Sequence, residues 1–343
     1  MKIDFLELDL RTYELEFKNF LPANIFDSHI HLFDRSCFVD GFELPSKSCY
    51  HRFDGTFTIE QCLAWAKELL PDQQFHLNSF GYPTYDSDLD ASGVYTGRVS
   101  DNRRYFGMAL VSPHDSAEAV ALRVKENKLI GYKPYLNFVD WKEIPDITIH
   151  DMLPEAQMQV AEERGLAITL HIPRPARLAD PVNQNQMVEL CRRYPGVKIV
   201  FAHIGRAYFL RNVVGFLDRI AECENAYIDT AMVNHEGVLE HTFTNFPLDR
   251  ILFGTDAPIS FLRGKSVEIN NQYAYLMGDD YEIGTSIFDS DGAVNFTFFF
   301  YEQLRGIKLS AERAGLSSKQ IEDIFYHNSI RLFSEIAERN YGI

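Results

Sequence analysis

One plan repeats along the chain and constrains the fold more than any other feature: short apolar runs alternate with helical patterns. Eight runs are rich in β-branched and aromatic residues: 24–32, 75–82, 106–112, 129–135, 167–172, 198–203, 226–231 and 250–255. Apolar residues at helical spacing lie between most of them, at 58–70, 116–127, 151–165, 183–194, 207–223 and 236–245. The runs are apolar on both faces, as is typical of parallel strands covered by helices. Eight such units predict an α/β fold, a closed (β/α)₈ TIM barrel.

The alternative architecture is an open, doubly wound sheet. A glycine-rich Gly-x-Gly-x-x-Gly turn after the first strand would favour it, and the sequence has no such turn there. Since a barrel of this kind commonly takes about 250 residues or more, we expect a single domain over 1–343, with the barrel over 24–335.

Several segments should distort the barrel. Residues 1–24 alternate apolar and charged side chains, and we expect an extension packed beside the first strand. Segment 34–56 has no clear period, and a long irregular loop is often functional. Segment 256–292 is expected to be a lid or an extra helix with a loop. An apolar helix at 293–308 should pack on the barrel, and the last helix begins at a capping box that starts at Ser317.

The charge and the cysteine content exclude several classes of protein. A net charge of −16 argues against binding to nucleic acid or to an anionic membrane surface, although a locally basic pocket could still hold an acidic substrate. No apolar run approaches the about 20 residues of a membrane span, and the acidic N-terminal residues do not fit a signal peptide. Five scattered cysteines suit free thiols in a reducing cytoplasm: Cys37, Cys49, Cys62, Cys191 and Cys223.

Polar residues stand at the carboxyl ends of the expected strands, where the active site of a barrel lies. His29 and His31 end the first strand and point the same way, about 7 Å apart along the chain. His171, His203 and Asp256 end the fifth, sixth and eighth strands. Taken singly, each histidine could be structural and Asp256 could cap a helix. Burying all of them together would cost several kcal/mol unless they are paired or bind an ion.

Three histidines and one carboxylate suit Zn²⁺ or another divalent metal such as Mn²⁺. A divalent ion lowers the pKa of a bound water, so that hydroxide forms near neutral pH. His203 would then remain for acid–base work, because the pKa of histidine lies near working pH. The other histidines lack this placement and are interpreted as structural or surface residues, with His235, just after the seventh strand, left open.

The pattern His29-x-His31, His171, His203 and Asp256 on successive strands resembles the amidohydrolase superfamily, and most of all its amidohydrolase-related branch of decarboxylases and lactonases. The resemblance spans about 25–335 and includes the terminal stretch 328–333. It implies one metal ion, held by His29, His31, His171 and Asp256, with His203 as the acid–base residue. It also implies a homodimer.

In binuclear relatives the histidine after the sixth strand is instead a ligand, and a lysine on the fourth strand is carboxylated and bridges the two ions. Lys133 stands where such a lysine would be. The metal-free lactonases of the branch leave the presence of any ion to be tested.

Basic residues gather near the same strand ends: Lys133, Arg174, Arg177, Arg206 and Arg263. Each could be an ordinary solubilising charge. On a chain this acidic, several together favour an anionic small-molecule substrate held by bidentate contacts. Arg206 is the first candidate for binding this substrate, and Arg174 and Lys133 are the next candidates.

The expected activity is metal-dependent hydrolysis of a lactone, ester or amide in a small, carboxylate-bearing substrate. Metal-bound hydroxide would be the nucleophile, and His203 and Asp256 would steer the proton to the leaving group. The same groups could instead serve a non-oxidative decarboxylase of an aromatic or unsaturated acid. A third possibility is a non-catalytic barrel that binds a ligand.

Overall fold

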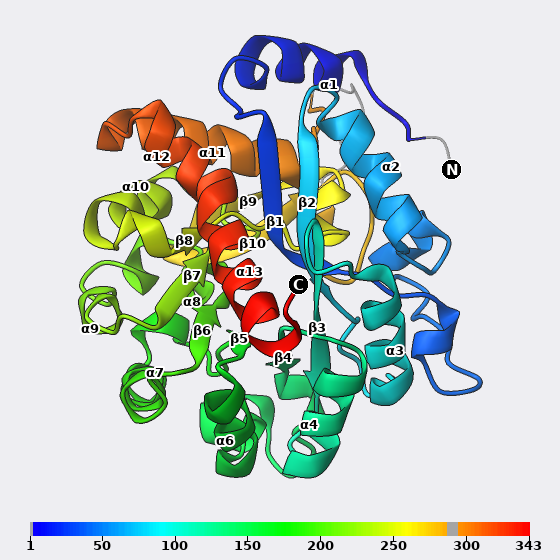
Figure 1. Ribbon diagram of the computed structural model, residues 1–343. Helices are drawn as coiled ribbons and strands as arrows, with labels where there is room; N and C mark the ends of the chain where they lie inside the picture. Colours follow the sequence, from blue (N-terminus) through cyan, green and yellow to red (C-terminus); the bar gives the residue numbers. More distant parts are fainter. Residues whose placement is uncertain (1–2, 287–293) are drawn as a thin grey trace.

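Eight parallel strands surround a central core in the computed structural model, which describes residues 3–286 and 294–343. The strands follow one another around the sheet in sequence order, and each pairs in parallel with the next (Figure 1). Their bounds are β1 Asn24–His31, β2 Gln74–Phe80, β3 Tyr105–Val111, β4 Gly131–Pro134, β5 Ala167–Leu170, β6 Lys198–Phe201, β7 Ala226–Asp229 and β8 Ile251–Leu252. With helices between the strands, the (β/α)₈ prediction is confirmed.

The barrel closes between β8 and β1 through residues just beyond β8. Ile30 and Ala257 form an isolated parallel bridge, and the N–H of His31 donates to the Ala257 carbonyl at 2.8 Å. The N–H of Ser28 donates to the carbonyl of Phe253 at 2.9 Å. This seam therefore joins the end of the chain's eighth strand to the strand that carries the first two histidines.

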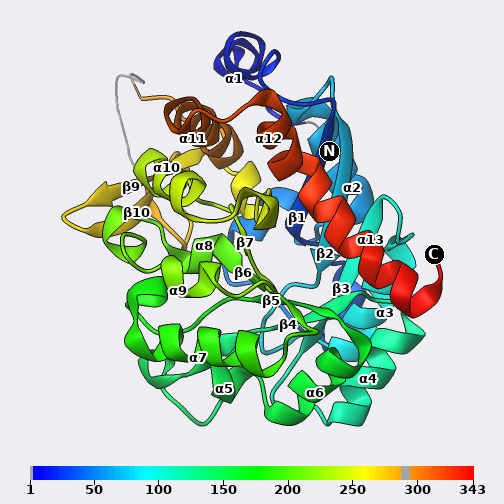
Figure 2. The same ribbon diagram turned by 60° about the vertical axis from the view of Figure 1, so that its left-hand side comes forward.

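Most of the helices cover the outside of the barrel (Figures 1 and 2). The bounds of the helices are α1 Glu7–Thr12, α2 Ile59–Leu69, α3 Leu89–Val99, α4 Ala117–Glu126, α5 Ile149–Met152, α6 Glu155–Arg164, α7 Pro181–Arg193, α8 Ala202–Arg206, α9 Asp218–Ala221, α10 Glu236–Asn245, α11 Phe299–Ala314, α12 Ser318–Glu322 and α13 Asn328–Tyr341. Helix α8, by contrast, carries two residues that line a cavity, His203 and Arg206. Five helices expected between the strands are present as α2, α4, α6, α7 and α10. The expected helix at 207–223 is wrong: that segment consists of turns and the short α9, and Gly215 within it has φ 80°.

Both ends of the chain pack on the barrel. The N-terminal segment is a short helix, α1, which a π-helical turn continues to Phe17, so the expected extension packs as a helix. The C-terminal helices start at the predicted capping box of Ser317 and Gln320. In Figure 1 α13 (red) crosses the strands, and its Phe333 ring lies 5.5 Å from Phe26 of β1 and 5.9 Å from Phe106 of β3.

The segment after β8 forms a small sheet in place of the expected extra helix. β9 Gly264–Ile269 and β10 Gln272–Met277 are an antiparallel hairpin, and β11 Thr285–Ser286 pairs with β10. In Figure 2 this hairpin (yellow) stands beside α10. Residues 287–293, which include the end of the expected lid and the first residue of the expected helix at 293–308, lie outside the described residues.

The long segment 34–56 contains two 3₁₀ turns, Arg35–Cys37 and Cys49–Phe53, and is otherwise irregular, as expected. Among the residues that the structure describes, no helix is long and apolar enough to span a membrane.

Candidate metal centre and active site

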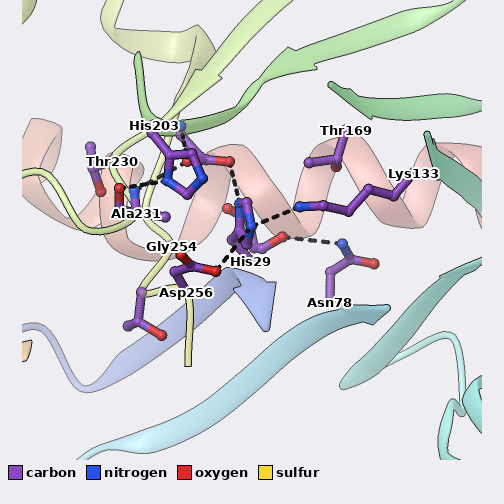
Figure 3. Close-up of polar contacts among 12 residues, drawn as sticks. His29, Asn78, Lys133, Thr169, His203, Thr230, Ala231, Gly254 and Asp256 are labelled. Carbon is purple, nitrogen blue, oxygen red and sulfur yellow. Dashed lines mark hydrogen bonds and ion pairs between the residues drawn. The ribbon is translucent and has the colours of Figure 1, made fainter. Parts of the chain in front are cut away.

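The two histidines at the end of β1 converge on Asp256, which follows β8. Nε2 of His29 lies 3.4 Å from the Asp256 carboxylate oxygen Oδ1, and Nε2 of His31 lies 3.3 Å from the same oxygen. Both rings leave the strand on one side because side chains alternate along it. The three groups lie close enough together to share one metal ion, and Figure 3 shows His29 and Asp256 facing each other.

The second nitrogen of each imidazole is held by a hydrogen-bond acceptor. His29 Nδ1 lies 2.9 Å from the carboxylate of Asp229, and His31 Nδ1 lies 2.8 Å from the carbonyl oxygen of Gly81. Because these oxygens accept, Nδ1 carries the proton, and the Nε2 lone pairs point toward Asp256. Burial lowers the pKa of both histidines, so they stand neutral, as metal ligands must. Although burial opposes it, the contact with His31 lowers the pKa of Asp256.

Asp256 is fixed by bonds on both sides of it. Its backbone is left-handed, with φ 67°, and its N–H donates to the His29 carbonyl at 2.8 Å. Thr255 donates its N–H and its hydroxyl to the buried carboxylate of Asp27, at 2.9 and 2.5 Å. The Thr255 hydroxyl oxygen also accepts the N–H of Ala257 at 3.0 Å. The loop that carries Asp256 is therefore tied to β1 by side chains as well as by backbone.

His203 shares Asp229 with His29. The N–H of His203 donates to Asp229 at 2.8 Å, and Nδ1 lies 2.9 Å from the carbonyl oxygen of Ala231 (Figure 3). Nδ1 therefore carries the proton, and Nε2 keeps its lone pair. Residues 203–206 are all left-handed, with φ between 52° and 61°, a conformation that persists only where the surroundings over-determine it. Burial lowers the pKa of His203, which keeps the ring neutral and able to accept a proton.

His171 lines the same cavity but stands apart from the group of three. Its ring lies 5.3 Å from the ring of His203 and 4.8 Å from that of Tyr135. Its Nδ1 is buried and has no hydrogen-bond partner among the described residues. Burial lowers its pKa well below the usual value. The structure thus places His171 at the cavity with an unused ring nitrogen, outside the group of close ligand atoms.

Lys133 of β4 reaches into the same group. Its side chain is fully buried, and Nζ lies 2.8 Å from Nε2 of His29 and 3.8 Å from the ring centre of Phe80 (Figure 3). Burial lowers the pKa of Lys133 to about 7. The amine therefore changes its protonation state near neutral pH, and it occupies the direction of the His29 lone pair.

The other basic residues divide between the cavity and elsewhere. Arg206 lines the cavity; Nη1 donates to the Ile172 carbonyl at 2.9 Å, and its Nε is buried with no partner among the described residues. Arg174 is not among the lining residues, because Asp180 holds its Nε at 3.0 Å. The expectation that Arg174 meets the substrate therefore lacks structural support.

Two further arginines expected near the cavity mouth have other partners. Arg263 is bound to the buried Asp9 at 2.7 Å, on the N-terminal segment. Arg177 packs its guanidinium over the rings of Tyr273 and Tyr208.

The cavity has a volume of about 410 Å³, and its polar lining includes His29, His31, Lys133, His171, His203, Arg206 and Asp256. Six tyrosines contribute to its wall: Tyr50, Tyr82, Tyr135, Tyr208, Tyr273 and Tyr275. Sequence reasoning assigned no role to Asp229, although it ends β7 as Asp256 follows β8, and the same criterion could have selected it. It also missed Tyr273 and Tyr275, whose signal is an alternating pattern around Asn270 and Asn271.

The donor set fits a divalent metal ion. Two neutral imidazoles and one ionised carboxylate direct lone pairs to one place, and Asp229 and Gly81 fix the two rings from behind, as outer-shell partners of metal sites do. His171 stands at the same cavity as a further candidate ligand. Lys133 competes for the lone pair of one of these ligands, His29.

Comparison with solved structures agrees with the fold. A 4-oxalomesaconate hydratase from Rhodopseudomonas palustris matches with a TM-score of 0.54 at 16% identity, over 90% of this chain and 95% of its own. A dihydroxybenzoic acid decarboxylase from Polaromonas sp. JS666, with bound manganese and the inhibitor 2-nitroresorcinol, gives 0.53 at 16% identity over 91% and 97%. A probable 2-pyrone-4,6-dicarboxylic acid hydrolase from Acinetobacter baumannii, with citric acid bound, gives 0.52 at 13% over 90% and 99%.

Sequence comparison identifies the family. No curated protein sequence matches the chain significantly. A model of the amidohydrolase family matches residues 85–334, which contain β3 to β8 together with His171, His203 and Asp256. The His and Asp group at the barrel mouth is in keeping with the metal-dependent enzymes of this family. The chain therefore belongs to the amidohydrolase family.

Proposed function

We propose that the protein is a metal-dependent hydrolase that acts on a lactone, ester or amide bond of a small, carboxylate-bearing substrate. The observation that carries the proposal is the convergence of His29 Nε2 and His31 Nε2 on one oxygen of Asp256, at 3.4 and 3.3 Å. His29, His31 and Asp256 would hold one divalent ion, Zn²⁺ first and Mn²⁺ next, with His171 as the fourth ligand. A bound ion supplies an activated water and polarises the carbonyl.

His203 and Asp256 are the proposed catalytic residues. His203 Nε2 has a free lone pair, because Nδ1–H is committed to the Ala231 carbonyl, so it can take the proton of the attacking water. It then returns that proton to the leaving oxygen or nitrogen. Asp229 holds both His29 and His203, and so keeps the base and the ligand at a fixed separation.

Arg206 is the proposed anchor for the substrate carboxylate. It lines the cavity, and its buried Nε lacks a partner among the described residues, so an anion would supply the missing acceptor. Lys133 adds a second cationic group when it is protonated. The small anionic partner proposed from the sequence is thus supported by two basic residues on the cavity wall.

Decarboxylation of an aromatic or unsaturated acid is the second candidate. The tyrosine-rich wall favours it, because aromatic side chains suit a flat ring. In this reaction His203 would first take a proton from solvent at Nε2 and then give it to the ring carbon that carries the carboxylate. The carbon–carboxylate bond would then break, its electron pair would restore the ring and CO₂ would leave. Both reactions need the same ion, the same acid–base group and the same cationic anchor.

A parallel assay decides between these candidates. Protein purified without chelator would be analysed for metal and then offered lactones, esters, amides and aromatic or unsaturated carboxylic acids, with proton release and CO₂ release both recorded. Hydrolysis predicts acid release without CO₂. CO₂ from an aromatic acid, with every lactone, ester and amide intact, would establish the decarboxylase. Metal-replete protein inactive on the whole panel would favour a ligand-binding barrel.

We also propose a cytoplasmic homodimer. The five cysteines are all free and buried, which supports a reducing compartment. The dimer follows from family resemblance alone, and light scattering of the purified protein would test it.

A further inference from the structure

The hairpin β9–β10 supplies one wall of the cavity. Tyr273 and Tyr275 of β10 line it, as do Glu282 and Ile283 just before β11. These four residues lie outside the eight strands of the barrel and the helices that connect them. The shape of the cavity therefore depends on an element that the barrel itself does not require.

Charged side chains fix β9 to the body of the protein. Lys265 is paired with Glu302 of α11 at 2.7 Å. Arg263, directly before β9, binds both oxygens of the fully buried Asp9 at 3.1 and 2.7 Å. Two ion pairs to two distant parts of the chain hold the base of the hairpin in place.

The second half of β9 is also bound to the body of the protein, and His235 takes part in this contact. Nδ1 of His235 accepts the N–H of Gly237 at 3.1 Å, so the ring proton lies on Nε2, which meets Glu268 at 2.9 Å. Ser266 donates its hydroxyl to Asn234 at 2.7 Å. These contacts hold β9 to the body of the protein, and β10 pairs with β9 along its length.

A stack of side chains connects this wall to the acid–base residue. The rings of Tyr273 and Tyr208 are stacked, with centres 4.5 Å apart and an interplanar angle of 24°. The guanidinium carbon of Arg177 lies 4.2 Å from the Tyr273 ring centre and 5.0 Å from that of Tyr208. Tyr208 in turn lies 5.8 Å from the ring of His203. Arg177 is not among the cavity-lining residues, and its contacts with the wall are those with the two rings.

We propose that the hairpin β9–β10 determines the specificity of this site. Tyr273 limits the size of the substrate, and Arg177 is a positioning residue that holds Tyr273 against Tyr208 by cation–π contact. The proposal rests on the proposed function only in taking the cavity beside His203 as the place where substrate binds.

Binding of two carboxylate probes tests the wall without any need for turnover. Benzoate and 2-naphthoate carry the same charge and differ in size, and calorimetry would give the affinity of the purified protein for each. We expect the unaltered protein to prefer benzoate. In Tyr273→Ala the ratio of the two affinities should shift toward 2-naphthoate by roughly five- to tenfold, because a stacked ring is removed. Tyr273→Phe keeps the ring and should keep the preference.

The role of Arg177 has its own pair of variants and a matched control. Arg177→Met keeps much of the side-chain volume but loses the charge, and it should shift the probe ratio toward 2-naphthoate by roughly threefold. Arg177→Lys keeps the charge and should restore much of the preference of the unaltered protein. Arg98→Met is the control, because Arg98 also lies over a tyrosine, Tyr95, at 5.1 Å, and neither residue lines the cavity. It should leave the ratio unchanged.

Several results would overturn the inference. These are failure of the unaltered protein to bind either probe, an equal loss for both probes in Tyr273→Ala, or a change in Arg98→Met as large as that in Arg177→Met. If the variants show the expected probe ratios but the protein has no metal and no turnover, the role of the hairpin in specificity is supported and the proposed function is wrong. If the protein turns over substrate but the probe ratio is unaltered in every variant, the proposed function is supported and the role of the hairpin in specificity is wrong.

Discussion

Nζ of Lys133 lies 2.8 Å from Nε2 of His29, the atom with which His29 would bind a metal ion. One lone pair cannot accept a hydrogen bond and bind an ion at the same time. Metal binding at His29 therefore requires the lysine amine to move away or to change its chemistry. The His29 imidazole therefore has two alternative partners, the Lys133 amine and a metal ion. Burial of Lys133 favours the neutral form of the amine, which carries no charge to repel the ion.

Lys133→Met tests the state of that amine in metal-free protein. The pKa of Lys133 falls from 10.5 to about 7 in the folded protein, so unfolding takes up a proton between these values. Stability contributed by this residue should therefore rise with pH across that window and level off below it, by roughly 1.4 kcal/mol per pH unit. Urea unfolding of both proteins from neutral to alkaline pH measures the difference. A difference that stays constant with pH would show that the lysine is charged throughout.

The double variant His29→Ala and His31→Ala should lose the metal ion. Two of the three close donors are removed, and Asp256 and the more distant His171 are too few donors for a site of this kind. Elemental analysis should fall from about one ion per chain to near zero. His114→Ala, which removes an exposed histidine, should keep the full content. Retention of the ion by the double variant would place the metal elsewhere.

His203→Asn should keep the ion and lose activity by roughly 10²- to 10⁴-fold, because the acid–base nitrogen is removed while the ligands stay. Burial lowers the pKa of His203, so the neutral base persists below the usual pKa of histidine, and the acid limb of kcat/KM should lie below pH 6.5. A pH–rate profile with metal analysis measures both. Loss of the ion from this variant would make His203 a ligand, as in binuclear relatives.

Thr255→Val should weaken metal binding about tenfold, because its hydroxyl joins Asp27 to the loop that carries Asp256. Thr255→Ser keeps the hydroxyl and should restore the affinity. Ser28→Ala is the matched control: it removes a seam hydrogen bond of 2.7 Å to Phe253 and none to the Asp256 loop. Competition with a chromogenic chelator gives the affinities. Equal losses of metal affinity in Thr255→Val and Ser28→Ala would show that Thr255 acts only by helping to close the barrel.

Arg206→Met should raise KM for an anionic substrate by about tenfold or more, with a smaller change in kcat, because it removes the charge that we assign to the carboxylate. Arg174→Met is the comparison, since Asp180 already holds that guanidinium. Steady-state kinetics on the substrate found in the panel gives both constants. If Arg174→Met raises KM as much as Arg206→Met, the sequence prediction for Arg174 stands after all.

The barrel could be predicted from the sequence because parallel strands buried on both faces leave continuous apolar runs. Helix α3 could not, since Gly93 and Gly97 lower its helical propensity. Its tertiary contacts explain those glycines: a Cβ on Gly97 would lie 2.6 Å from the carbonyl oxygen of Asn127, and one on Gly93 would lie 2.9 Å from Arg123. Close tertiary packing determines the residues of α3, and such packing cannot be inferred from a local sequence pattern.

The gathering of His29, His31, His171, His203 and Asp256 at one cavity could be predicted because each of them ended an apolar run. The partners of the arginines could not be predicted. Asp9 lies in the N-terminal helix α1, Asp180 lies in a loop before α7 and Tyr273 lies on a hairpin, and the positions of these elements depend on the whole fold. The false helix at 207–223 has a similar origin. Its apolar residues have helical spacing, but the chain there turns through left-handed residues at 203–206 and at Gly215.

The seam between β8 and β1 also orders the events of folding. The bond between Asp27 and Thr255 joins residues 228 positions apart, whereas every other strand of the barrel pairs with its neighbour in sequence. Contacts of such separation form slowly, because a long loop must close first. A chain still being synthesised can align seven strands and remain without His29 and Asp256 in contact. Metal binding by His29, His31 and Asp256 would thus have to wait until the chain beyond β8 has been synthesised and has met β1.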